Sequence, residues 1–252
     1  MEHYGSLYLS YAAAVVGWFA LSRIFPKLWP KQDLITFPKP WREIGYVLLA
    51  GIAVVCIGQL YVRGWRLPND GPAGPLLESV NQILIFSPMF VLLALRRQPL
   101  DTAWIRWDKF GWRIASGLGL ALVALLVYSL VRDGADAWWR IVPRVYAYEN
   151  LPHAVQVFLE DVAIAMLAVR FSAALGVRST VLLVAALFAA GHIPTMISNG
   201  ATPSELTSLV GDAFLGVLVI GTAMRSRDIW WIWCVHFAMD MTQFARVSGV
   251  GD

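Results

Sequence analysis

The chain has 252 residues, of which 58% are hydrophobic and 15% are charged, and its formal net charge is +3. This composition is too apolar for a water-soluble domain of that length and is typical of a polytopic membrane protein. The positive charge is spread over short loops and forms no basic block, so we expect contact with a lipid bilayer and no nucleic-acid partner.

Eight apolar windows follow one another along the chain, and each is predicted to be a helix because lipid cannot hydrogen-bond an exposed backbone. They cover about residues 7–25, 44–62, 76–95, 112–131, 154–175, 179–193, 206–224 and 229–244. None shows the strict alternation of a membrane barrel strand. We therefore predict an all-α polytopic membrane helix bundle with about eight transmembrane helices, forming a single integral-membrane domain over residues 1–252.

The first window has no Lys or Arg before Arg23 and no small-residue cleavage site, so we expect an uncleaved span and not a signal peptide. The two cysteines, Cys56 and Cys234, each lie inside an apolar window. A thiol in that setting behaves as a small hydrophobic group, so no disulfide framework is predicted.

Basic residues are divided unequally between the loops on the two sides of the predicted bundle. Of the 20 Lys and Arg residues, 14 follow odd-numbered windows and six, including Arg246, follow even-numbered ones. The positive-inside rule makes the richer side cytoplasmic and predicts that both termini lie outside.

Residues 133–152, between the fourth and fifth windows, combine Trp138, Trp139, Tyr146 and Tyr148 with charged residues. Aromatic side chains of this kind concentrate at the headgroup level of a bilayer. We predict a surface helix that serves as an interfacial anchor, with a lid over a site as the alternative.

Adjacent acids interrupt the fifth window at Glu160 and Asp161, about two turns from its outer end. A charged side chain near the bilayer centre costs about 2.5–3.5 kcal/mol, so such residues usually face one another or a wet cavity. Glu160 is therefore a candidate general base. The alternative is an acid that is satisfied by a buried partner.

Two later windows carry histidines at helical spacing. Phe188 and His192 lie four residues apart at the end of the sixth window, and His236 and Asp240 lie four residues apart in the eighth. This offset places both members of a pair on one helix face, so Asp240 is expected to hold a ring nitrogen of His236 and set its tautomer. A simple helix-packing bond is the alternative.

Taken together, Glu-Asp, Phe-x-x-x-His and His-x-x-x-Asp, in this order and in three spans, resemble the motifs of the CPBP intramembrane proteases. That family includes the type II CAAX prenyl endopeptidases and the bacterial Abi and bacteriocin-processing proteins. The resemblance covers about residues 158–240, and we place the catalytic core at about residues 154–245. It implies an integral membrane protein of a prokaryotic plasma membrane.

The resemblance implies that Glu160 and His192 activate a water, while His236 and Asp240 stabilise the oxyanion or orient the site, with Asp161 beside them. The implied activity is hydrolysis of a peptide bond in a membrane-tethered protein or peptide at the bilayer surface. The predicted topology places the site near the outer ends of its spans, so we expect it to open outward. The sequence specifies neither the substrate nor an oligomeric state.

Two positions depart from the family pattern. Asp161 replaces the second of two glutamates, and Ala165 stands where the family has an arginine. The nearest candidate for that arginine, Arg170, is about 7 Å further along the helix axis and is not expected to replace it.

An ionised Asp240 cannot donate a hydrogen bond to an oxyanion, as an asparagine could. It could instead help to bind zinc or another divalent metal, and the possible ligand set is His192, His236, Glu160 and Asp240. The resemblance is compatible with a metallopeptidase and with a glutamic mechanism. We favour no cofactor, with Glu160 as the base.

Two other functions compete with proteolysis. The first is a proton-coupled transporter in which Glu160, Asp161, His192 and Asp212 relay protons, although two related halves and paired broken helices are not evident. The second is a catalytically inactive membrane-binding relative of the protease, which the missing arginine would favour. Polar residues in the third window, Glu78, Asn81 and Gln82, are expected to form hydrogen bonds between helices.

Overall fold

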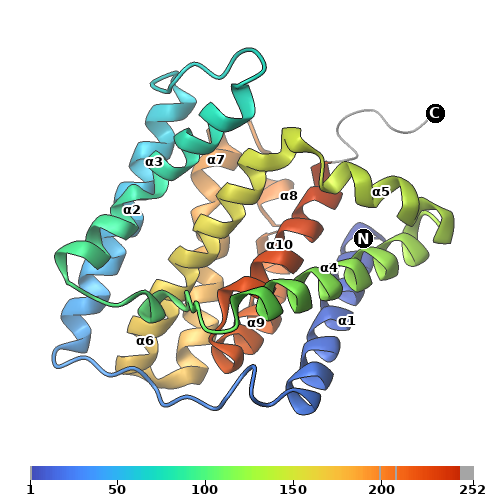
Figure 1. The fold of residues 1–252 in the computed structure, drawn as a ribbon. Helices are drawn as coiled ribbons and strands as arrows, with labels where there is room; N and C mark the ends of the chain where they lie inside the picture. Colours follow the sequence, from blue (N-terminus) through green and yellow to red (C-terminus); the bar gives the residue numbers. More distant parts are fainter. Residues whose placement is uncertain (1, 199, 208, 245–252) are drawn as a thin grey trace.

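The computed structural model describes residues 2–198, 200–207 and 209–244, and these residues form helices and connecting loops without any β-strand (Figure 1). This result confirms the predicted all-α bundle. Arg246, one of the six basic residues predicted on the outer side, lies outside the described residues.

The α-helices are α1 Glu2–Ile24, α2 Pro40–Val62, α3 Gly74–Leu95, α4 Phe110–Arg132, α5 Trp138–Val145, α6 Leu151–Gly191, α7 Ile193–Ser198, α8 Pro203–Leu206, α9 Leu209–Ser226 and α10 Ile229–Phe244. Short 3₁₀ turns cover Leu100–Ala103, Ala135–Ala137 and Tyr148–Asn150.

Six of the described helices are long and apolar enough to cross a membrane, namely α1, α2, α3, α4, α6 and α9. Helix α6 has 41 residues and changes direction at Gly176, whose φ of 74° and ψ of 169° are not helical. A positive φ is accessible to glycine because it has no Cβ. Its two halves form a hairpin in Figure 1, and they correspond to the windows predicted at 154–175 and 179–193.

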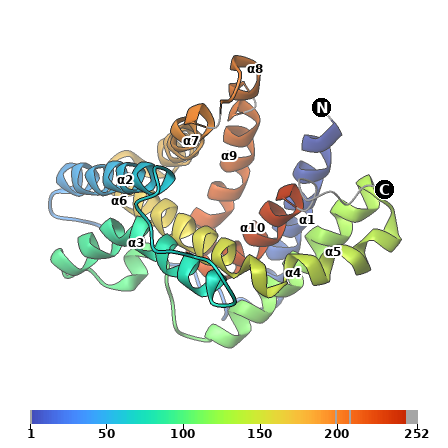
Figure 2. The same ribbon diagram turned by 90° about the horizontal axis from the view of Figure 1, so that it is seen from above.

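The last predicted window corresponds to α10, which has 16 residues and packs between α4 and α6. Most of its side chains are buried, and Trp231, Ala238 and Met239 are almost completely enclosed. Gly117 of α4 permits the closest approach, because a Cβ there would lie 2.7 Å from the Cα of Trp231. Viewed from above, α4, α10 and α1 form one side of the bundle, while α2, α3 and α6 form the other (Figure 2).

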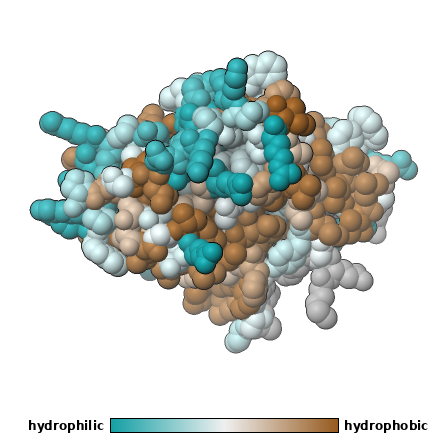
Figure 3. Space-filling model, turned by 90° about the horizontal axis from the view of Figure 1, so that it is seen from below, coloured by the Kyte–Doolittle hydropathy of each residue, from teal (hydrophilic) through white to brown (hydrophobic). Residues whose placement is uncertain are grey.

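The two ends of the bundle differ in charge. One end carries the basic connections that include Lys27, Arg106 and Arg227, and hydrophilic side chains gather over much of this face (Figure 3). The opposite end carries the α2–α3 loop, the segment around α5, and α7 and α8. We call these the basic end and the site end.

A buried ion pair stabilises the basic end. Nη1 of Arg113 on α4 lies 2.6 Å from Oδ2 of Asp228 in the α9–α10 connection, and both side chains are 0% exposed. The indole Nε1 of Trp29 donates to the same carboxylate oxygen at 2.6 Å. This cluster links the α1–α2 connection, α4 and the start of α10.

The segment predicted as a surface helix contains α5, which packs on α4 and α10. The indole of Trp138 donates to the carbonyl oxygen of Leu122, and the ring of Tyr146 contacts Phe237 at a centroid distance of 5.9 Å. Trp139 is exposed. The helix is therefore confirmed, whereas its role as an interfacial anchor stays a prediction.

Candidate active site

Four of the five predicted site residues lie on two neighbouring helices, α6 and α10, and the fifth directly follows α6. Glu160 and Asp161 lie in the first half of α6, His192 directly follows the second half, and His236 and Asp240 lie on α10. The hairpin at Gly176 brings the second half of α6 back towards the site end, where it is followed by α7 (Figure 1).

A direct contact joins α6 to α10. The distance between Nδ1 of His236 and Oδ1 of Asp161 is 2.9 Å, and the Asp161 side chain is only 5% exposed. This differs from the expectation that Asp240 holds His236, because the partner of Nδ1 is on the neighbouring helix and not one turn away. The other carboxylate oxygen of Asp161, Oδ2, is buried without a hydrogen-bond partner.

Glu160 points into a less enclosed environment than its neighbour and is half-buried. Its Oε1 accepts a hydrogen bond of 2.9 Å from Nε2 of Gln156, one turn earlier on the same helix. The amide orients the carboxyl group without neutralising it with a positive charge. Adjacent acids on one helix thus have different partners, a histidine for Asp161 and an amide for Glu160.

His192 is exposed, and its Nδ1 lies 2.9 Å from the carbonyl oxygen of Phe188. A carbonyl only accepts hydrogen bonds, so Nδ1 carries the hydrogen, and Nε2 of the neutral ring retains its lone pair. The ring of Phe188 contacts both imidazoles, with centroid distances of 4.8 Å to His192 and 6.2 Å to His236. Phe188 is therefore a neighbour of both histidines.

Asp240 connects the set electrostatically. It is partly exposed and lies near enough to His236, Glu160 and His192 to interact with all three, and with His153 at the start of α6. The structure therefore brings Glu160, Asp161, His192, His236 and Asp240 together around the site end of α6 and α10.

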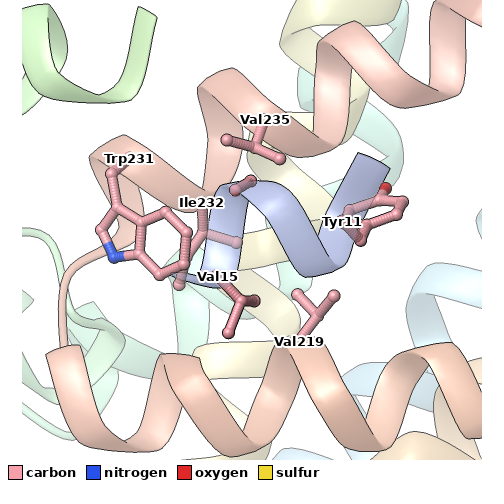
Figure 4. A pocket seen from close by; sticks show the side chains of 7 residues that line it. Tyr11, Val15, Val219, Trp231, Ile232 and Val235 are labelled. Atoms are coloured by element: carbon pink, nitrogen blue, oxygen red, sulfur yellow. The ribbon is translucent and has the colours of Figure 1, made fainter. Parts of the chain in front are cut away.

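Two further polar residues lie near this set: Asp212, which the sequence suggests only as part of a proton relay, and Tyr11, which the sequence does not single out. The buried Tyr11 of α1 lies near Asp161, Asp212 and Asp240, and Asp212 of α9 lies near His192. Figure 4 shows Tyr11 at one end of a small apolar pocket, with its hydroxyl group directed away from that pocket. A lone tyrosine in an apolar window carries no signal of this kind.

The position of the missing arginine is filled by the methyl side chain of Ala165, which is 0% exposed. Arg170 is buried further along α6, where its guanidinium donates to the carbonyl oxygens of Thr102 and Met166 and to the side chain of Gln98. These partners hold it near the basic end. Arg170 thus has a role in packing there, as expected of a residue that does not replace the family arginine.

The possible metal ligands do not converge on one point. Among the described residues, no three His, Cys, Asp or Glu side chains lie close enough together to hold a metal ion. The donors His192, His236, Glu160 and Asp240 therefore do not fit a zinc site as they are arranged here. No catalytic step is assigned to a metal.

The fold and the site define a class of protein: an integral membrane helix bundle with carboxylates and imidazoles gathered near one membrane face. Residues 151–242 match a family described as Type II CAAX prenyl endopeptidase Rce1-like. The match confirms the predicted resemblance, because this segment is similar to a family of CAAX-type endopeptidases. The matched segment contains all five predicted site residues, whereas Tyr11 lies outside it. Comparison with curated proteins and with solved structures gave no match.

Proposed function

We propose that the protein is an intramembrane endopeptidase that hydrolyses a peptide bond of a membrane-tethered protein or peptide at the bilayer surface. The observation that carries this proposal is the contact between His236 and Asp161, around which Glu160, His192 and Asp240 gather within the family-matched segment. Peptide hydrolysis needs a base, a positioned water and a donor for the tetrahedral oxyanion, and these side chains supply such groups.

In the proposed mechanism, Glu160 is the general base. It takes a proton from a water that also donates a hydrogen bond to Nε2 of His192, and the water oxygen attacks the carbonyl carbon of the scissile bond. As the carbon–nitrogen bond breaks, Glu160 gives this proton to the leaving amine nitrogen and returns to its starting state. Gln156 supports this role because it orients one oxygen of the carboxyl group and adds no charge.

We assign stabilisation of the oxyanion to His236 and Tyr11. When His236 is protonated, its Nδ1 donates to Asp161, and Nε2 on the opposite side of the ring also carries a hydrogen that it can donate to the substrate. Asp240 has no hydrogen to donate when it is ionised, and Tyr11 provides a neutral hydroxyl donor near the same carboxylate. Asp240 then acts as a positioning residue through its interactions with His236 and His192.

The site and the basic loops lie at opposite ends of the bundle, and the positive-inside rule therefore supports a site that opens outward. An outward site suits the trimming of exported, membrane-tethered proteins. Accessibility tags at residue 70 and at residue 30 test this orientation, and labelling of residue 30 alone from outside would reverse it.

The function is tested by mass spectrometry of membrane-protein termini from cells with wild-type protein, with Glu160→Ala, and with the matched control Glu149→Ala, which removes an exposed carboxylate. We expect new termini with wild type and with the control, and their loss with Glu160→Ala at unchanged protein level. The same measurement with a chelator separates a metal-dependent reaction from a glutamic one. Identical termini in all samples would contradict proteolysis.

The interactions of Asp212 with His192 and Tyr11 favour a proton-coupled transporter as the second candidate function. Proteoliposomes with an imposed pH gradient distinguish the two functions. A transporter dissipates the gradient and releases no fragment, whereas a protease cleaves without a gradient.

A further inference from the structure

A groove at the basic end of the bundle is not used by the proposed reaction. It lies between α1 and α4, has a volume of about 910 Å³, and is bordered by Gly17 and Ala20 on one helix and by Ala115 and Gly119 on the other. Leu120 of α4 packs closely against Gly17, whereas the space beside Gly119 is open. The volume is near the upper end of the range of about 300–1,000 Å³ that is typical of small-molecule sites.

Two lysines lie at one end of this otherwise apolar groove. Lys27 belongs to the α1–α2 connection and Lys109 precedes α4, and both side chains are exposed. The ammonium group of Lys109 donates to the backbone carbonyl oxygen of Lys27, which holds the two residues together. The groove therefore has an apolar body and a positively charged end.

The acid next to Lys109 in sequence does not neutralise this end, because Asp108 is engaged elsewhere. Its carboxylate oxygens lie 2.9 Å from Nε of Arg106 and 2.9 Å from Nη2 of Arg113. Burial alone would raise the pKa of Asp108, but the two arginines lower it further than burial raises it, so the group stays ionised and paired with them. The lysines remain available to another anion.

We propose that this groove binds one anionic glycerophospholipid, with an acyl chain along the small residues and the phosphate group between Lys27 and Lys109. Both bordering helices are membrane spans, so the groove faces lipid, and its charged end lies with the basic loops. Anionic lipids concentrate beside such loops and attract Lys and Arg. The complementarity of charge and apolar length favours a lipid over a second protein chain, which would leave the lysines unpaired.

The test uses the full chain in detergent micelles and measures thermal unfolding with added phosphatidylglycerol or phosphatidylcholine, together with native mass spectrometry of retained lipid. We expect phosphatidylglycerol to raise Tm more than phosphatidylcholine, and the double variant Lys27→Gln/Lys109→Gln to abolish that difference. Lys31→Gln is the matched control, because it lies on the same basic connection without lining the groove. Lys31→Gln should retain the full difference in Tm between phosphatidylglycerol and phosphatidylcholine.

A second variant tests the apolar part without changing charge. A Cβ at Gly119 would have no atom within 4 Å, so Gly119→Leu extends into the groove without a clash in the bundle. It should remove the retained phosphatidylglycerol seen by native mass spectrometry. Equal Tm shifts with both lipids, a full shift with inorganic phosphate alone, or a dimer that Gly119→Leu dissociates would each overturn the proposal. None of these measurements depends on peptidase activity.

Discussion

Nδ1 of His236 lies 2.9 Å from Oδ1 of Asp161, and this contact joins α10 to α6 although the two residues are 75 positions apart in the chain. It sets the orientation of the imidazole relative to Glu160, the residue next to Asp161. The second acid of the pair is therefore a positioning group in the proposed mechanism, while Glu160 is free to act on water.

Replacing Asp161 tests that division of roles. Asp161→Asn keeps an oxygen that accepts from Nδ1 but removes the negative charge that balances a protonated His236, so we expect kcat to fall about 100-fold with little change in KM. Asp161→Glu restores the carboxylate and should recover part of the activity. A purely structural role predicts equal losses in both variants, together with a lower Tm. Cleavage kinetics on a membrane-tethered peptide identified by its new terminus provide the measurement.

The hydroxyl group of Tyr11 is expected to contribute to catalysis. Tyr11→Phe removes one oxyanion donor, and kcat should fall about 100-fold or more at unchanged KM. Tyr8→Phe is the control on the same helix, because its hydroxyl donates to the carbonyl oxygen of Gly211 at 2.6 Å and links α1 to α9. That control should lower Tm and leave kcat unchanged. Wild-type kcat in Tyr11→Phe would remove Tyr11 from the mechanism.

Loss of the buried ion pair at the basic end should destabilise the protein. Arg113→Met leaves Asp228 enclosed without its cation, and we expect a loss of about 3–5 kcal/mol in the free energy of unfolding. The double variant Arg113→Met/Asp228→Asn removes both charges and should lose less than Arg113→Met alone. Denaturant unfolding in mild detergent measures both values. A larger loss in the double variant would show that the pair is not the source of the effect.

Acid sensitivity should depend on Asp108. Burial raises its pKa, but Arg113 and Arg106 together lower it more, so the pKa in the folded protein is below the ordinary value of 3.8. Ionised Asp108 therefore stabilises the folded state above that ordinary value, and this contribution disappears as the pH falls through the lowered pKa. Asp108→Asn should lose stability at pH 7 and show a smaller further loss of Tm below about pH 4 than wild type. Parallel Tm profiles for the two proteins would contradict this assignment.

The sequence by itself determined the helical architecture and was enough to nominate the candidate site residues. Continuous apolar windows require helices, since backbone polar groups in lipid must be satisfied within the segment. Acids and histidines inside such windows are costly, so the positions of Glu160, His192 and His236 are informative on their own. Apolar windows and the ionisable residues inside them are features of short stretches of sequence, so they can be recognised without knowing how the helices pack.

Only the tertiary structure decided which groups meet. Spacing within one helix suggested Asp240 as the partner of His236, but the packing of α10 against α6 places Asp161 against Nδ1 instead. The packing of the helices also places Tyr11 of α1 near Asp161 and Asp240, and it places Arg170 near the basic end. Contacts between helices depend on the direction of each helix and on close approaches such as Gly117 against Trp231, and a pattern along one stretch of sequence does not contain that information.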